Sequence, residues 1–250
     1  MSLFGKVLDF LFPRSCELCG GETDGGMPIC GTCREKFLAE CFEHCPVCGR
    51  TALRCECGAD FTAATRTSLG GRRFFTLMFY RSEKAYGESD RVSEKLIFSL
   101  KENGRTAGFF AGEIARGLGR LLGEAGEDAA EWIITYPPRS AEKLYKCGFD
   151  QSELMAKKLA AALGCRAERT MIRGGRSAEQ KTLGREDRAA NAEETLIPLR
   201  RNIKDGGKYI LIDDIITSGA TVTAAARLLY GCGAAEVIPV SAARTMPRGK

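Results

Sequence analysis

The sequence predicts an α/β protein in which helices flank a parallel β-sheet and a small cysteine-rich module comes first. Two observations support this prediction. Strand and helix patterns alternate from residue 74 to residue 250, which is typical of a parallel sheet covered on both faces. Nine of the 12 cysteines lie within residues 16–57. This break in composition predicts a module over residues 1–60 and a larger domain over residues 74–250, joined by a polar connector.

The elements of the larger domain follow from local patterns. The apolar run at residues 74–80 predicts a first strand, and helical periodicity follows at residues 92–101 and 104–122. Further apolar runs predict strands at residues 132–136, 166–172, 209–212 and 236–242. Helices are expected at residues 150–163 and 218–231, so that strands and helices alternate along the chain.

Charge is distributed unevenly along the chain, whose net charge is +5. Residues 1–57 carry six basic and eight acidic side chains, whereas residues 166–204 carry ten basic and six acidic ones. The excess of positive charge in the larger domain fits phosphate-rich small molecules or a nucleic-acid backbone. Scattered, solvated surface charge is the alternative.

The first residues predict neither a membrane span nor a secretory signal, because Lys6 and Asp9 interrupt their apolar stretch. Apolar residues at helical spacing over residues 3–11 predict a short amphipathic helix. We expect it to pack on the cysteine module, with docking on a membrane surface as the alternative. A cytoplasmic location follows, and in such a reducing compartment dense cysteine pairs bind metal more often than they form disulfides.

The cysteines form four closely spaced pairs, each of which supplies half of a tetrahedral zinc site. The simplest arrangement is two structural zinc ions, each held by two successive pairs. The predicted ligands are Cys16, Cys19, Cys30 and Cys33 for one ion and Cys45, Cys48, Cys55 and Cys57 for the other. The last pair has one intervening residue instead of two, so Cys41 or His44 could replace one of its ligands.

Residues 209–222 predict a phosphate-binding strand and loop. Two carboxylates, Asp213 and Asp214, follow an apolar strand, and a hydroxyl-rich loop with Gly219 then leads into a helix. A helix N-terminus and closely approaching backbone N–H groups bind phosphate. Adjacent carboxylates suit the vicinal hydroxyls of a ribose. Solvated aspartates beside a helix cap are the alternative.

Several segments resemble one known family. The string DDIITSGAT at residues 213–221 looks like the phosphoribosyl pyrophosphate motif of type I phosphoribosyltransferases. Together with the cysteine module it resembles the ComF family, with its N-terminal double zinc ribbon, over nearly the whole chain. Two further blocks agree, namely ITYPPRSAEKLYKCGFDQ at residues 134–151 and GCGAAEVIPVSAART at residues 231–245. Departures from the family pattern are Cys147, where a basic residue is usual, and Asp150, where Asn is usual.

The resemblance implies a type I phosphoribosyltransferase-like sheet that binds phosphoribosyl pyrophosphate or a nucleotide with Mg²⁺. It further implies an enzyme that transfers a phosphoribosyl group to a nitrogen acceptor. Asp213 and Asp214 would hold the ribose as the catalytic pair. The 5′-phosphate would bind to Thr217, Ser218, Gly219, Ala220 and Thr221, and the pyrophosphate to Pro138, Arg139, Ser140 and Lys143. The polar segment 173–195 would be a flap carrying Gln180, Arg185, Arg188 and Asn191, with a solvated loop as the alternative.

The same family also implies a second function, because it is associated with the uptake of single-stranded DNA during natural transformation. Such a protein would need a basic groove along the backbone and aromatic side chains for stacking. The basic flap at residues 173–195 is the candidate groove. The acidic cysteine module suits the docking of competence-machinery proteins better than it suits phosphate contacts, and we expect it to fold on a core of its own.

Overall fold

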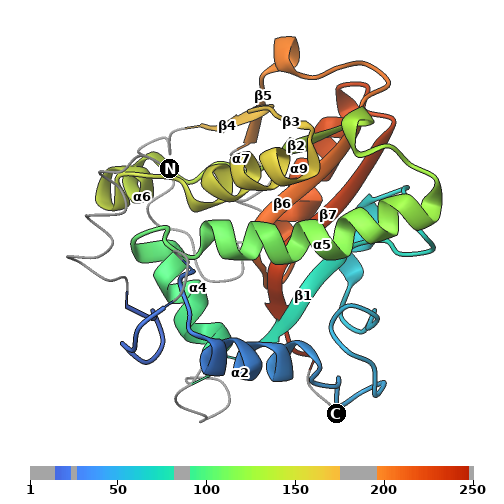
Figure 1. The fold of residues 1–250 in the computed structure, drawn as a ribbon. Helices are drawn as coiled ribbons and strands as arrows, with labels where there is room; N and C mark the ends of the chain where they lie inside the picture. The colour runs from blue at the N-terminus through green and yellow to red at the C-terminus, as the bar shows by residue number, and fades with distance from the viewer. Residues whose placement is uncertain (1–14, 24–26, 82–90, 175–195, 248–250) are drawn as a thin grey trace, which may run out of the picture.

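The structure is a computed structural model that describes residues 15–23, 27–81, 91–174 and 196–247 (Figure 1). Its main sheet has five strands in the order β1-β7-β6-β2-β3. All four pairings are parallel, which confirms the predicted α/β class. The strands are β1 (Phe75–Tyr80), β7 (Glu236–Thr245), β6 (Lys208–Ile216), β2 (Trp132–Thr135) and β3 (Arg166–Ala167).

Helices cover both faces of this sheet (Figure 1). Side chains of a strand point alternately to its two faces. Ile210 and Ile212 of β6 therefore pack with α4 (Val92–Glu102), α5 (Ala107–Ala125) and α7 (Gln151–Leu163). Tyr209 and Leu211 pack with α9 (Ala220–Gly231) on the opposite face. Because both faces are buried, β6 is a continuous apolar run and does not alternate with polar residues.

The structure differs from the sequence prediction in several elements. The strand expected at residues 166–172 is divided into β3 and β4 (Met171–Arg173), and β4 pairs antiparallel with β5 (Leu196–Pro198) in a second sheet. β6 continues to Ile216, so Asp213 and Asp214 lie within the strand and not after it. The elements that the patterns did not indicate are α2 (Gly31–Cys41), η1 (Asp60–Ala64), η2 (Ala129–Glu131), α6 (Ala141–Cys147) and η4 (Arg200–Asn202).

The cysteine-rich part packs directly on the sheet domain, so the two parts do not have separate hydrophobic cores. Cys16, Cys33 and Phe37 belong to the same buried cluster as α5 and the strands. Polar contacts reinforce this packing. The Glu40 carboxylate of α2 accepts hydrogen bonds of 2.7 and 2.9 Å from the first backbone N–H groups of α4, where a negative charge is favourable. The boundary near residue 60 stays a prediction about the chain's organisation.

None of the described helices is long and apolar enough to cross a membrane. The short helix expected at residues 3–11 lies outside the described residues.

Candidate functional site

The acidic pair of β6 lies where the strand approaches its carboxyl end, beside the first turn of α7. The Gln151 side chain donates a 3.2 Å hydrogen bond to Asp214, and the Ser152 hydroxyl donates a 3.3 Å bond to Asp213. Asp214 is 6% exposed, and Lys101 of α4 lies 3.5 Å from its carboxylate. Desolvation by the surrounding protein, together with the neighbouring Asp214, raises the pKa of Asp213 well above its usual range. A cation or several hydroxyl donors would relieve this repulsion.

The predicted phosphate residues 217–221 form the turn from β6 into α9. Gly219 is the N-cap of α9 and has a φ of +76°, a conformation that favours glycine. The Ala220 N–H lies 3.4 Å from the Ser218 hydroxyl, and no side chain of the N-cap residue covers the helix end. The turn therefore presents backbone N–H groups and the positive end of the helix dipole.

Phe61 of η1 packs against the backbone of Gly219. A Cβ atom placed on Gly219 would lie 2.7 Å from the Phe61 Cγ atom, so the contact leaves no room for a side chain. Phe61 is 4% exposed and forms an edge-to-face pair with Phe74. The polar connector between the module and the larger domain therefore contacts the predicted phosphate turn through Phe61.

The predicted pyrophosphate loop follows β2 and faces the start of α7. The Asp150 carboxylate accepts a 2.6 Å hydrogen bond from the Arg139 N–H and caps α7 through bonds from the backbone N–H groups of Ser152 and Glu153. Asp150, a departure from the family pattern, thus ties the loop to the helix. The Nε and Nη1 atoms of Arg139 are buried and have no hydrogen-bond partner within the described residues. An anion in the loop would provide one.

Two of the remaining predicted site residues, Pro138 and Ser140, lie in the loop between β2 and α6. Pro138 is buried, and its carbonyl accepts a 2.8 Å hydrogen bond from Arg173 of β4, a contact that the sequence did not indicate. Ser140 is the N-cap of α6, where it accepts a 3.4 Å bond from the Lys143 N–H. The flap residues Gln180, Arg185, Arg188 and Asn191 lie outside the described residues.

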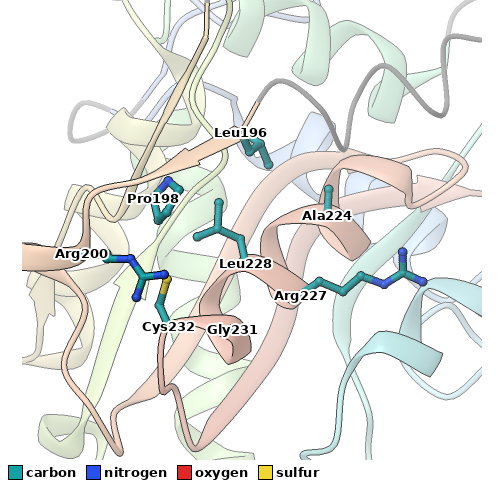
Figure 2. A pocket seen from close by; sticks show the side chains of 8 residues that line it. All are labelled: Leu196, Pro198, Arg200, Ala224, Arg227, Leu228, Gly231 and Cys232. Carbon is teal, nitrogen blue, oxygen red and sulfur yellow. The ribbon is translucent and has the colours of Figure 1, made fainter.

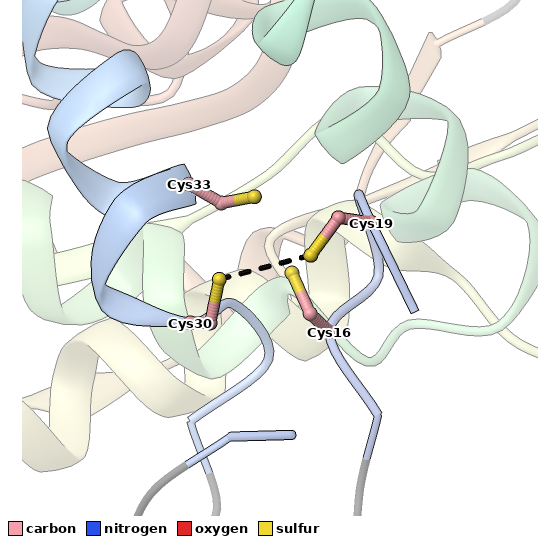
Figure 3. A group of neighbouring side chains, drawn as sticks. All are labelled: Cys16, Cys19, Cys30 and Cys33. Carbon is pink, nitrogen blue, oxygen red and sulfur yellow. Dashed lines mark hydrogen bonds between the residues drawn. The ribbon is translucent and has the colours of Figure 1, made fainter. Parts of the chain in front are cut away.

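The eight predicted cysteine ligands gather in two groups of four, and within each group the sulfur atoms lie within 4.8 Å of one another. Figure 3 shows Cys16, Cys19, Cys30 and Cys33 pointing toward a common centre, with 3.7 Å between the Cys19 and Cys30 sulfurs. Four converging sulfurs form the donor set of a structural zinc site. These are the two groups that the spacing predicted, and both could hold zinc.

The thiols of the first group show why such a cluster needs a cation. Burial opposes ionisation of Cys16, but surrounding backbone N–H groups lower its pKa to about 6. Burial and the neighbouring thiols instead raise the pKa of Cys33. Four thiolates cannot be held together without positive charge. Cys41 and His44 belong to neither group, and burial raises the pKa of Cys41 to about 12.

Arg244 connects the second cysteine group to the end of β7. It is 2% exposed, and its guanidinium donates 2.8 Å hydrogen bonds to the carbonyls of Cys55 and Cys57. The same guanidinium lies over the rings of Phe74 and Phe79, at 5.3 and 5.0 Å. A buried charge needs compensation, and a zinc ion with four thiolates would carry the opposite net charge.

Two surface cavities of about 400 Å³ each lie along the outer side of α9 and not at the acidic pair. Both are lined by Arg227 and Gly231. Figure 2 shows the first cavity, with Arg200 and Arg227 at its edges and Leu228 between them. Arg66 lines the second and lies over the Tyr230 ring at 5.3 Å. This side of α9 is therefore concave and basic.

Comparison with known proteins gives matches over most of the chain. Residues 150–248 match the phosphoribosyl transferase domain family. The DNA utilization protein YhgH of Salmonella typhimurium is 27% identical over 84% of this chain and 93% of its own length. The competence protein ComFC of Bacillus subtilis is 24% identical over 84% of this chain and 81% of its own length.

A solved structure matches part of the chain. The allosteric regulatory enzyme of purine biosynthesis matches 60% of this chain with a TM-score of 0.39 and 21% identity, and the chain spans 30% of that enzyme's length.

The parallel sheet and the domain match define the class of this protein: it carries a phosphoribosyltransferase-type domain, preceded by two four-cysteine groups. The similarity to DNA utilization and competence proteins covers most of the chain. The resemblance to the ComF family that the motifs indicated is confirmed, and it extends over 84% of the chain.

Proposed function

We propose that this chain binds phosphoribosyl pyrophosphate or a nucleotide, together with Mg²⁺, at the carboxyl ends of β2 and β6. One observation carries the proposal: an acidic pair, half-buried Asp213 and buried Asp214, is followed by a glycine turn at the N-terminus of α9. Ligands of open α/β sheets bind at such strand ends. The carboxylates would accept hydrogen bonds from the ribose hydroxyls, and the turn would receive the 5′-phosphate.

The adjacent groups support the same ligand. The unpartnered nitrogens of Arg139 suit a pyrophosphate, and the hard oxygens of Asp213 and Asp214 would suit Mg²⁺ carried by the ligand. In a transfer reaction the ribose C1–oxygen bond to pyrophosphate breaks and a C1–nitrogen bond to the acceptor forms. Pyrophosphate leaves with the bonding electrons, and the acceptor nitrogen loses its proton to solvent. Residues Arg139 and Lys143 would stabilise the charge on the leaving group.

Phosphoribosyl pyrophosphate with Mg²⁺ is expected to raise the melting temperature of the protein. Binding to the native state alone adds about 2.7 kcal/mol at a hundredfold excess over Kd, or about 5 to 10 °C for a chain of this size. Asp214→Asn should remove most of this shift, whereas Asp128→Asn, at the distant N-cap of η2, should retain it. Thermal melts with and without ligand test this, and an undiminished shift in Asp214→Asn would place the ligand elsewhere.

A second candidate function is binding of single-stranded DNA, as in a protein of DNA uptake during natural transformation. The specific observation in its favour is the concave surface on α9, to which Arg66, Arg200 and Arg227 contribute. Relatives named for DNA utilization and competence agree with it. Arginines lining a groove suit the phosphate backbone, which carries most of the affinity of nonspecific binding.

Charge reversal on this surface is expected to weaken the binding of oligo-dT. If three phosphates are neutralised, the log–log dependence of affinity on salt should have a slope of about −2. Arg200→Glu with Arg227→Glu should reduce both the affinity and this slope. Arg116→Glu with Arg120→Glu, on α5 across the sheet, is the matched control. Equal losses in both pairs, measured by fluorescence anisotropy at several salt concentrations, would contradict a site on α9.

The cysteine-rich part is proposed to contact competence-machinery proteins. Its side chains Phe42 and Val47 are 68% and 52% exposed, which offers apolar contact area. Its acidic groups support this less than the sequence suggested, because Glu17, Glu40 and Glu43 bind side chains or backbone of the same chain. A cytoplasmic location is proposed because the 12 cysteines are free thiols.

A further inference from the structure

We propose that Lys101 is a further ligand-positioning residue of the phosphoribosyl site, specific for the pyrophosphate end of the ligand. It lies in the last turn of α4, outside every segment that the sequence motifs indicated. Its ammonium group is 3.5 Å from the Oδ2 atom of Asp214. The same oxygen accepts a 3.2 Å hydrogen bond from the Gln151 side chain. This proposal rests on the proposed binding of phosphoribosyl pyrophosphate.

The end of α4 is held in place by contacts that fix where Lys101 starts. Glu17, which lies between Cys16 and Cys19 in the sequence, accepts a 2.8 Å hydrogen bond from the Ser99 hydroxyl and a 2.8 Å bond from Arg105. Thr106 donates a 2.9 Å bond to the carbonyl of Leu96. These contacts fix the backbone before and after Lys101. Its long side chain can still change its rotamer and its partner.

The same turn packs beside the predicted pyrophosphate loop. A Cβ atom on Gly104, which follows α4, would lie 3.2 Å from the Phe149 ring, so the turn is in contact with Phe149. The Arg139 guanidinium lies 5.8 Å over that ring. Lys101 therefore contacts Asp214, and the turn that follows it contacts Phe149, over which Arg139 of the loop lies.

The positive charge of Lys101 would favour binding of an anionic ligand beside Asp214. A polyanionic ligand that binds next to Asp213 and Asp214 meets repulsion, and a nearby ammonium group offsets it. The Lys101 side chain is 41% exposed while that of Asp214 is 9% exposed, so the lysine can turn toward an incoming ligand without a buried charge being moved. When the ribose hydroxyls occupy Asp214, Lys101 is released to contact the pyrophosphate oxygens.

Two probes that differ in one group test the proposal. Phosphoribosyl pyrophosphate carries the pyrophosphate, and ribose 5-phosphate lacks it. At fixed Mg²⁺, Lys101→Met is expected to weaken binding of phosphoribosyl pyrophosphate by about tenfold or more, which corresponds to one charge-assisted contact of about 1.4 kcal/mol. Binding of ribose 5-phosphate should change by less than about threefold, and Lys101→Arg should restore most of the loss.

The control is Lys157→Met on α7, where the lysine is also paired with a carboxylate, Glu153, at 2.6 Å. It should leave both affinities unchanged in isothermal titration calorimetry. Equal losses for the two probes in Lys101→Met would show a structural role and overturn the proposal. Tighter binding of phosphoribosyl pyrophosphate would overturn it too, because Lys101 would then only compete for Asp214. If the unaltered protein binds neither probe, the proposed function itself fails, and this outcome is recognised before any variant is made.

Discussion

Replacing Cys55 by serine is expected to unfold the whole described protein at a lower temperature, and not the cysteine-rich part alone. Structural zinc sites contribute on the order of 10 kcal/mol to folding. Loss of the second zinc ion would also leave the buried guanidinium of Arg244 without compensating charge. Breaking a buried charge pair costs about 3–5 kcal/mol, and Arg244 belongs to β7, which pairs with both β1 and β6.

The only tryptophan makes this result easy to measure. Trp132 is fully buried in β2, so its fluorescence reports unfolding of the sheet. We expect about two zinc ions per chain by elemental analysis of the unaltered protein and about one in Cys55→Ser, with a lower melting temperature at Trp132. Cys147→Ser, outside both groups, should change neither quantity. An unchanged Trp132 transition after loss of zinc would show that the two parts fold independently.

The second large effect is expected from Gly219→Ala. An alanine there would adopt a φ of +76° and would press its methyl group into Phe61. The unfavourable φ costs about 1 kcal/mol, and overpacking adds about 1–3 kcal/mol. The variant should also lose affinity for phosphoribosyl pyrophosphate, because the turn that carries the proposed phosphate site must move.

Gly126→Ala separates the two causes, since this glycine has a similar φ of +71° but nothing within 4 Å of an added Cβ atom. It should lose only the conformational part of the free energy of unfolding. Adding Phe61→Ala to Gly219→Ala should recover part of the steric loss. Denaturant titrations of the four proteins measure these differences. Equal losses in Gly126→Ala and Gly219→Ala would mean that Phe61 does not support the turn.

Local patterns predicted most strands of the main sheet, because these features depend on neighbouring residues. Buried parallel strands are continuous apolar runs, and the string around Asp213 and Gly219 contains its own turn chemistry. The spacing of the cysteines likewise gave the two groups in which they meet. The extent of β6 was underestimated, because its last residues are held by pairing with β7, as in Ile216 with Arg244.

Features that depend on distant contacts were not predictable. Lys101 reaches Asp214, and Phe61 reaches Gly219, across more than a hundred residues of sequence, so no local pattern indicates either contact. The shared hydrophobic core was missed for the same reason. Phe37 looks like part of a small module, yet it packs against Phe109 and Phe110 of α5 with ring centroids 4.9 and 6.4 Å apart.

The hydrogen bonds from Arg244 to the second cysteine group can form only late in synthesis, after the cysteines have been made. Cys55 and Arg244 are 189 residues apart, so the cysteines leave the ribosome long before their partner exists. At about 5–20 residues per second this interval lasts roughly 10 to 40 s. The four thiols therefore meet zinc, oxidants and chaperones as part of a nascent chain. The hydrogen bonds from Arg244 to the carbonyls of Cys55 and Cys57 form only when β7 inserts between β1 and β6.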